Sequence, residues 1–304
     1  LTSILVIIGV TIVIFSLVHM APGDPVQMMA GLDAKEEDIE ALRAKMGMDK
    51  PLIVQYFNYV KGLLHLDLGK SIITNKNISD EIFFRFRNTA ELAVAGMLIS
   101  SVFGIIIGII AAVNRDRWLD KTLMSLSITG ISMPSFLLAL LLMLLLVSQW
   151  HLLPASGREG SPFTAEGFKY IILPALTLGI SGTASIARLT RSSVVAVLNE
   201  EFVMTLKAKG LRRKMILFKH ILRNASLPIL TMIGLDFGYL LGGAVVTETI
   251  FAWPGIGKYA MDAISQNDFP AVQGAVLILS MMFMLINLVV DLLYGVLDPR
   301  VSLE

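Results

Sequence analysis

The sequence predicts an all-α membrane protein with six transmembrane helices, an extracytoplasmic insertion after the first helix and a long cytoplasmic loop between the fourth and fifth. Three observations support this fold class. Hydrophobic residues make up 55% of the 304 residues and charged residues only 16%, whereas soluble domains carry roughly 25% charged residues. The apolar residues gather in runs long enough to cross a bilayer, and lysine and arginine concentrate in the connections of one side.

Six apolar runs are near the length of about 20 residues with which an α-helix crosses the hydrocarbon core. They are Leu1–Met20, Thr89–Val113, Thr122–Gln149, Ile171–Val197, Pro228–Phe251 and Ala271–Val290. Because the sequence begins inside the first run, we expect further residues before Leu1. A cleaved signal peptide is the alternative for that run, but its length exceeds the usual apolar core of about 7–15 residues and no small-residue cleavage site follows.

The orientation follows from the positive charges of the short connections, since cytoplasmic loops carry the excess of lysine and arginine. One side holds a large group of these residues: Arg115, Arg117, Lys121, Arg188, Arg191, Lys207, Lys209, Arg212, Arg213, Lys214, Lys219, Arg223 and Arg300. The loops of the opposite side hold only Arg158, Lys169 and Lys258. Both termini are therefore expected in the cytoplasm.

Residues 21–88 are exempt from this rule, which applies to loops of up to about 60 residues. They predict a small extracytoplasmic cap with a helix in "KEEDIEALRAKMG" that stops at Gly47. A solvated loop without a function is the alternative. The chain thus divides into a first span at 1–20, the cap at 21–88 and a core at 89–304 that contains a long loop at 198–227.

The long loop is cationic but carries apolar residues at intervals, at Phe202, Leu206, Ile216, Leu217 and Ile221. A glycine at position 210 interrupts it, and the proline at position 228 suits the first turn of the next helix. The pattern predicts two short amphipathic helices, joined at the glycine, along the cytoplasmic face. The alternative is an anchor that only touches anionic lipid.

Several motifs resemble the permease subunits of bacterial ABC importers, in the dipeptide, oligopeptide, glutathione and nickel branch. The long loop is similar to the EAA loop of that family through "TLKAKG" (205–210) and "HILRNASLP" (220–228). The other matching motifs, in chain order, are "APGDP" (21–25), "LDLGKS" (66–71), "GISMPSF" (130–136), "LLPASG" (152–157), "IARLTRSS" (186–193), "IFAWPGIGKYA" (250–260) and "DPR" (298–300). Two departures are a degraded EAA signature at Met204–Leu206 and an aspartate at position 236.

The resemblance implies one half of a solute channel in the bacterial inner membrane. A homologous second permease would complete the channel, two cytoplasmic ATPases would bind ATP and magnesium, and an extracytoplasmic protein would deliver the solute. This chain would then hold no cofactor and no catalytic residue. Its loop would couple the ATPases to the channel through Thr205, Lys207, Ala208, Lys209, Gly210, Leu211, Arg212, His220, Arg223, Asn224 and Pro228.

Nucleotide and metal motifs are weak. "GIGK" at 255–258 resembles a phosphate-binding loop, but Ala252 replaces its first glycine and Tyr259 stands where serine or threonine binds magnesium. A tight turn at Pro254–Gly255 explains these residues more simply. The histidines at 19, 65, 151 and 220 form no pair at the i, i+4 spacing of metal ligands on a helix.

Two acidic residues fall within the fifth span, where an ionisable group generally faces a cavity or a partner. Asp236 lies about eight residues into the span, and Glu248 lies three residues from its outer end. On a helix they are separated by roughly 120°. Both are candidate pathway residues, and Asp236 would attract a cationic group such as the amino terminus of a peptide. A structural carboxylate at the interface between permeases is the alternative.

Glycine and proline in the spans predict close packing and kinks. Gly104 and Gly108 form a GxxxG step in the second span, and Gly242–Gly243 lie in the fifth, so close approach to another helix is expected. Pro134 and Pro174 are expected to kink or start helices.

Taken together, the residues and the resemblance predict a non-catalytic permease that imports short peptides by alternating access. Nickel or a nickel chelate is the alternative solute, because three of the four histidines fall on the extracytoplasmic side. A membrane scaffold or receptor with a cytosolic partner other than an ATPase is the alternative from a different class. A membrane enzyme is a third possibility, but the spans and loops contain no convergent catalytic set.

Overall fold

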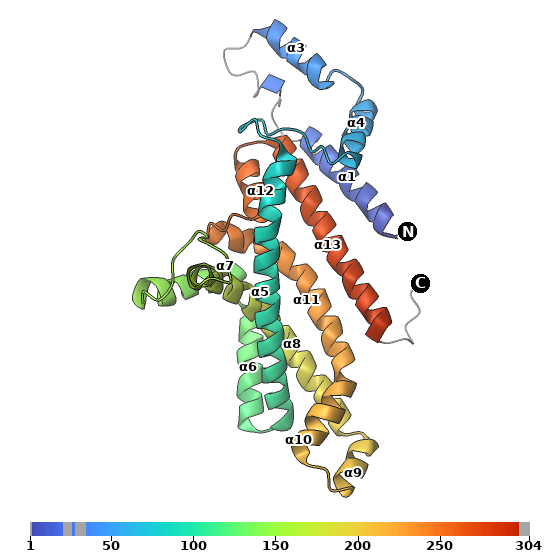
Figure 1. Ribbon diagram of the computed structural model, residues 1–304, viewed down its shortest axis with the longest axis vertical. Helices are drawn as coiled ribbons and strands as arrows, with labels where there is room; N and C mark the ends of the chain where they lie inside the picture. Colours follow the sequence, from blue (N-terminus) through green and yellow to red (C-terminus); the bar gives the residue numbers. More distant parts are fainter. Residues whose placement is uncertain (1, 21–25, 28–34, 298–304) are drawn as a thin grey trace. The chain divides into compact units, whose positions relative to one another are not determined.

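The computed structural model describes residues 2–20, 26–27 and 35–297, and these form helices joined by loops (Figure 1). Among them, an isolated antiparallel bridge joins Lys70 and Asn77 and no strand occurs. The motifs at 21–25 and 298–300 lie outside the described residues. The helices are α1 (Thr2–Met20), α3 (Glu36–Met46), α4 (Leu52–Leu64), α5 (Ile78–Val113), α6 (Trp118–Ser132), α7 (Ser135–Leu142), the π-helix η1 (Met143–Gln149), α8 (Ala165–Leu198), α9 (Glu201–Ala208), α10 (Arg213–Met215), the π-helix η2 (Ile216–Ile221), α11 (Leu222–Ile250), α12 (Ile256–Ser265) and α13 (Phe269–Leu297).

Four described helices are long and apolar enough to cross a membrane, and a fifth span results if α6 and the α7–η1 helix are one broken span. The remaining predicted span, which is the first in the chain, corresponds to α1, whose apolar part at Leu5–Met20 is shorter than the others. The four long segments are Ile78–Val113, Ala165–Leu198, Arg213–Gly242 and Phe269–Val290. The chain is therefore a multi-pass helical membrane protein.

The second and third predicted spans differ from the structure at their boundaries. α5 begins at Ile78 instead of Thr89, since Asp80 and Glu81 in its first turn complement the positive end of the helix. The third span breaks at Pro134 with a bend of 106°. The proline caps α7, and the residue before it is extended (φ −85°, ψ 125°) because a proline disfavours helical geometry there. The predicted kink at Pro134 is confirmed.

The prediction that Pro228 starts a helix is wrong. Pro228 lies inside α11, and helix continues through α10 and η2 from Arg213 onwards. Two separate short helices are therefore also not found, because only α9 is short and separate. A proline removes one backbone hydrogen bond from a helix interior, and membrane helices tolerate this where neighbouring helices and local π-helical adjustment satisfy the freed groups. Pro174 likewise lies inside α8.

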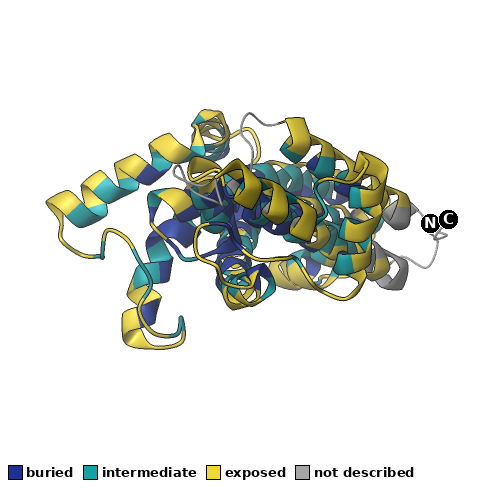
Figure 2. Cartoon of the chain, turned by 90° about the horizontal axis from the view of Figure 1, so that it is seen from above, coloured by how far each residue is buried: buried dark blue, intermediate teal, exposed yellow. Residues whose placement is uncertain are grey.

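The chain separates into two compact units, 1–89 with 254–284 and 90–253 with 285–304. Exposed and buried residues alternate along most helices (Figure 2). The first unit contains α1, α3, α4 and α12 together with the first parts of α5 and α13. In it, α3 ends at Gly47 in the left-handed conformation (φ +67°). The glycine stop predicted for this helix is confirmed.

The second unit is held together by close packing of α5 against α8. A β-carbon on Gly104 would stand 2.7 Å from Cβ of Ile186, and one on Gly108 would stand 2.5 Å from Cβ of Thr190. These distances are too short for any side chain, so both glycines are required for the approach of the two helices. The close approach predicted from the GxxxG step is confirmed, and it is made within the chain.

Candidate coupling loop and pathway residues

The loop predicted to be cytoplasmic consists of α9, a turn and the start of the long helix that leads into α11. Gly210 in the turn has φ +78°, a conformation that L-amino acids with a side chain rarely adopt. Its amide donates to the carbonyl oxygen of Lys207 at 3.0 Å, which closes α9. The sequence favours the turn here because a glycine follows a short run of good helix-forming residues.

A buried apolar cluster fixes α9 to the ends of the spans. Val203 of α9 is fully buried, and Ile216 and Ile221 of η2 are 3% and 1% exposed. They pack with Val194 and Val197 of α8. A displacement of α9 therefore has to move the ends of α8 and α11 with it, because a close-packed interior transmits strain.

The outer surface of the loop is cationic and partly apolar. Met204, Met215 and Phe218 are 70%, 47% and 63% exposed. Of the predicted loop residues, Leu211 and His220 are half-buried, and the remaining ones are exposed: Thr205, Lys207, Ala208, Lys209, Gly210, Arg212, Arg223, Asn224 and Pro228. Large apolar side chains surrounded by polar ones are typical of a surface that binds another protein.

A buried ion pair ties the connection between α5 and α6 to α8. Arg191 donates from Nε to Oδ1 and from Nη2 to Oδ2 of Asp120, each at 2.5 Å. The carboxylate also accepts the amide of Asp116 at 2.9 Å, and its side chain is only 3% exposed. Sequence reasoning counted Arg191 as a cytoplasmic charge and missed this clamp, since the two residues are 71 positions apart.

The two acidic residues of the fifth span are buried within the second unit. Asp236 is 9% exposed and Glu248 is fully buried. A β-carbon on Gly182 would stand 3.3 Å from Oγ of Ser100 and 3.5 Å from Oδ2 of Asp236, so α5, α8 and α11 meet at this point. Among the described residues, Oδ2 of Asp236 has no hydrogen-bond partner. A buried carboxylate oxygen without a partner is costly, which makes Asp236 a candidate for a contact that forms in another state.

Another side of α11 is exposed and was missed by sequence reasoning. It carries Leu235, Tyr239 and Val246, which are 50%, 78% and 44% exposed, together with Gly242. These positions repeat at helical spacing and share one side of the helix. Tyr239 lies at the centre of the predicted span, although tyrosine usually lies at the membrane surface where its hydroxyl meets water. The signal in the sequence was this central tyrosine.

The loop before α8 is fastened to the end of α11 in the second unit. Arg158 pairs with Glu91 of α5 at 2.7 Å, and its guanidinium carbon lies 5.6 Å from the ring centre of Trp253. The amide of Gly157 donates to the carbonyl oxygen of Phe251 at 2.8 Å. Trp253 is fully buried. The ion pair and the buried tryptophan therefore fix this loop to α5 and to the end of α11.

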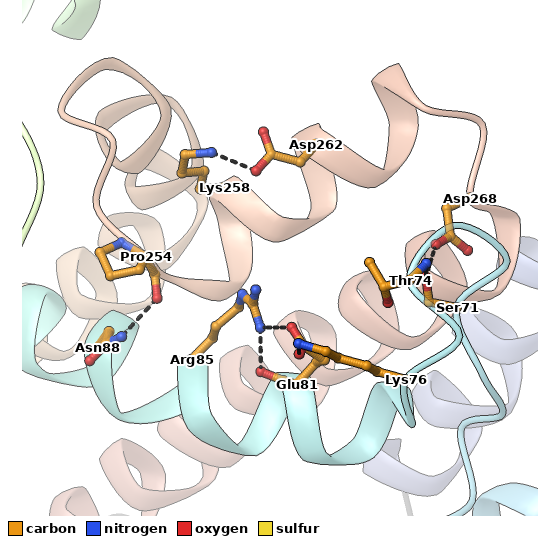
Figure 3. Close-up of polar contacts among 10 residues, drawn as sticks. All are labelled: Ser71, Thr74, Lys76, Glu81, Arg85, Asn88, Pro254, Lys258, Asp262 and Asp268. Carbon is orange, nitrogen blue, oxygen red and sulfur yellow. Dashed lines mark hydrogen bonds and ion pairs between the residues drawn. The ribbon is translucent and has the colours of Figure 1, made fainter.

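In the first unit, polar contacts join the start of α5 to α12 (Figure 3). Asn88 donates to the carbonyl oxygen of Pro254 at 2.8 Å, and the guanidinium of Arg85 lies 4.5 Å from the ring centre of Tyr259. Burial raises the pKa of Tyr259 to about 12, and the negative charge of Asp268 acts in the same direction. The guanidinium of Arg85 acts in the opposite direction, and its position over the ring is that of a cation–π contact.

A second contact in this unit holds the loop before α5. Oγ of Ser71 donates to Oδ2 of Asp268 at 2.5 Å, and the amide of Ile72 donates to Oδ1 at 3.2 Å. Asp268 directly precedes α13 and is 4% exposed. Within "GIGK", the amide of Ile256 donates to Oγ1 of Thr89 at 2.9 Å and Lys258 pairs with Asp262, so these residues have structural contacts.

Two of the four histidines make local contacts. Nδ1 of His19 lies 2.8 Å from the carbonyl oxygen of Phe15, and Nδ1 of His65 lies 2.9 Å from that of Lys61. The described part of the chain contains no group of three histidine, aspartate or glutamate side chains arranged for a metal ion.

The chain belongs to the family described as "Binding-protein-dependent transport system inner membrane component", which matches residues 104–303. The N-terminal region that accompanies this family matches residues 1–93. The two matches together cover nearly the whole chain. They define its class as the membrane component of a binding-protein-dependent transport system, and the resemblance seen in the motifs is confirmed.

Two curated relatives are similar over almost their full length. The dipeptide transport system permease protein DppB of Escherichia coli (strain K12) is 42% identical, over 97% of this chain and 94% of the relative. The glutathione transport system permease protein GsiC of Salmonella choleraesuis is also 42% identical, over 96% of this chain and 93% of the relative.

Solved structures with a similar fold come from two transporters. A chain of the inward-facing MetNI methionine ABC transporter matches with a TM-score of 0.60 and 15% identity, over 71% of this chain and 96% of that chain. A chain of an amino acid ABC transporter matches with a TM-score of 0.53 and 15% identity, over 73% of this chain and 95% of that chain. The all-α fold class predicted from the sequence is thus that of an ABC transporter permease.

Proposed function

We propose that the chain is the transmembrane subunit of an ATP-driven importer of short peptides and forms half of the translocation pathway. The observation that carries this proposal is the 42% identity to a dipeptide permease and to a glutathione permease over nearly the entire chain. Both solutes are small peptides. Nickel is the second candidate from the motifs, but neither of these two relatives is named for it.

The proposed assembly has a homologous second permease, two cytoplasmic ATPases and an extracytoplasmic substrate-binding protein. The ATPases bind ATP and magnesium, while this chain contributes no catalytic residue and no cofactor. It lies in the bacterial inner membrane with both termini in the cytoplasm, as the distribution of positive charges in the short loops favours.

In this assembly, the loop from α9 to α10 transmits the movement of an ATPase. The exposed side chains of Met204 and Phe218 enter an apolar groove of the ATPase, and the lysines and arginines around them contact its acidic rim. Because Val203 is fully buried against the ends of the spans, closure of the ATPases moves α9 and the attached helices as one body.

The pathway is proposed along α11. The exposed hydroxyl of Tyr239 at the centre of the span requires a polar partner, since a hydroxyl group in hydrocarbon without one is costly. Water and the peptide backbone supply such partners. Asp236 lies one helical turn away and attracts the amino terminus of the peptide when the helices rearrange, while Glu248 lies near the outer end.

The first test is ATP hydrolysis by the purified complex in lipid, together with its own binding protein. Short peptides, free nickel and chelated nickel are compared as the added solute. Stimulation by peptides alone is expected. Stimulation by nickel alone would replace the peptide assignment with the nickel alternative, and a preparation from which no ATPase copurifies would contradict the transporter function itself.

The coupling role is tested with Gly210→Val. The left-handed conformation costs a residue with a side chain roughly 1–2 kcal/mol, and valine resists it further because its side chain is branched. Uptake is expected to fall more than ATP hydrolysis. A matched control is Gly69→Val, which replaces a glycine that also has a left-handed conformation (φ +80°) and open space around its α-carbon but lies in the first unit. Unchanged uptake in the Gly210 variant would contradict the assignment.

The pathway role is tested with Asp236→Asn and Tyr239→Phe in complexes of normal assembly. A rise in KM for a peptide with a free amino terminus, and no rise for the same peptide with a blocked one, is expected for Asp236→Asn. The Tyr239 variant is expected to affect both peptides, because a hydroxyl does not distinguish them. Unchanged uptake in both variants would remove these residues from the pathway.

A further inference from the structure

Helix α4, in the segment predicted as an extracytoplasmic cap, packs along the side of α1. The hydroxyls of Thr11 and Tyr56 lie 2.9 Å apart. The ring of Phe15 lies 5.4 Å from that of Tyr56 and 6.0 Å from that of Tyr59. Closer to the end of α1, Nε2 of His19 lies 3.0 Å from the side-chain oxygen of Gln55. Figure 1 shows α4 beside the half of α1 that is far from the N-terminus.

These contacts set the depth of α4 relative to α1. Thr11 and His19 are eight positions apart, which corresponds to about 12 Å along a helix. One leaflet of a bilayer contains about 15 Å of hydrocarbon, half of the usual 30 Å. Since α1 ends at Met20 and is expected to span the membrane, α4 lies at the level of the outer leaflet and not above it.

The surface of α4 that points away from α1 is apolar. Ile53, Phe57 and Leu64 are 71%, 67% and 80% exposed. Their spacing of four and seven positions places them in one stripe on the helix. The polar side chains of Asn58 and Lys61 lie on another side of the helix. None of the residues of α4 is buried in the chain.

The side of α1 that faces away from α4 is also apolar, since Val13 and Leu17 are 55% and 61% exposed. In a membrane-spanning helix such residues face acyl chains. An apolar stripe on the other outer side of the α1–α4 pair, at the same depth and on an amphipathic helix, has the pattern of a helix that lies in the membrane interface. A lysine at its edge reaches the headgroups while its carbon chain stays in the apolar layer.

We propose that α4 is an interfacial helix in the outer leaflet, with Ile53, Phe57 and Leu64 among the acyl chains and Lys61 at the lipid phosphates. The segment at 21–88 is then in part a lipid-bound element that braces α1. The proposal requires the membrane location of the chain and is independent of the transported solute.

The test uses the absence of cysteine from the sequence. Single cysteines at Phe57 and Asn58 are spin-labelled in the whole complex, in lipid bilayers, with the cysteines of the partner chains removed. The accessibility of each label to oxygen, which partitions into lipid, is compared with its accessibility to a water-soluble nickel chelate. We expect oxygen to dominate for Phe57→Cys and the nickel chelate to dominate for Asn58→Cys.

Two results would overturn the proposal. Equal access of the nickel chelate to both labels would place α4 in water as a cap, and exclusion of both agents from the label at position 57 would mean that protein covers the stripe. The measurement is repeated with the binding protein added, and no change at position 57 is expected. Leu64→Cys provides a second reporter on the same stripe if the Phe57 variant does not assemble. If the complex still takes up peptides but the labels show either of these two results, the placement of α4 is contradicted and the proposed function is not.

Discussion

Replacement of Asp120 by alanine removes the acidic partner of the ion pair with Arg191 in the second unit. The native pair has two charge-assisted hydrogen bonds of 2.5 Å and an acidic side chain that is 3% exposed. Loss of one partner of a buried ion pair costs roughly 3–5 kcal/mol, because the other charge is left uncompensated. Arg191 is 27% exposed, so water partly solvates its released charge. We therefore expect a loss of about 2–3 kcal/mol.

The assay is thermal unfolding of the purified complex in detergent, followed by intrinsic fluorescence. A loss of 1 kcal/mol lowers the Tm of a 150–250-residue domain by roughly 2–4 °C, so Asp120→Ala is expected to lower it by roughly 4–12 °C. Arg115→Ala is the matched control. It removes a neighbouring pair with Asp116 at 3.3 Å whose side chains are 50% and 78% exposed, and exposed pairs contribute about 0–1 kcal/mol.

The double variant Asp120→Ala/Arg191→Met tests whether the unpaired charge of Arg191 causes the loss of stability. With both charges gone, no unpaired charge remains, and the loss should be smaller than the sum of the two single variants. If Asp120→Ala lowers Tm no more than Arg115→Ala, the ion pair does not hold the second unit together. An additive double variant would mean that the two residues act separately.

Two further predictions concern packing and the first unit. Gly108→Ala places a methyl group 2.5 Å from Cβ of Thr190, so we expect a lower Tm and a lower yield of complex. Gly242→Ala is the control, because its methyl group meets no atom within 4 Å. Equal Tm values for the two variants would count against the packing of α5 on α8. Asp268→Ala removes the acceptor for Ser71 and for the amide of Ile72. Limited proteolysis should then cleave the 66–77 loop faster than in the wild type, and an unchanged cleavage rate would show that the loop is held by other contacts.

The class of this protein could be predicted from the sequence because hydropathy is a local property. A run of about 20 apolar residues crosses a bilayer whatever its neighbours are, and the positive charges near Gly210 and Arg115 indicate a side of the membrane by their position alone. The GxxxG step at Gly104 likewise predicted close packing. The order of short motifs then indicated the family.

Contacts between distant residues were decided by the tertiary structure. Asp120 and Arg191 are 71 positions apart and meet only because α6 and α8 pack with a particular rotation. Hydropathy permits many such rotations, so the sequence alone does not select the pair. The same reason explains why the packing of α4 against α1 and the exposure of Tyr239 were not predicted. The sequence determined which segments are apolar enough to enter the membrane, and only packing decided which side of each helix is buried against protein and which is exposed.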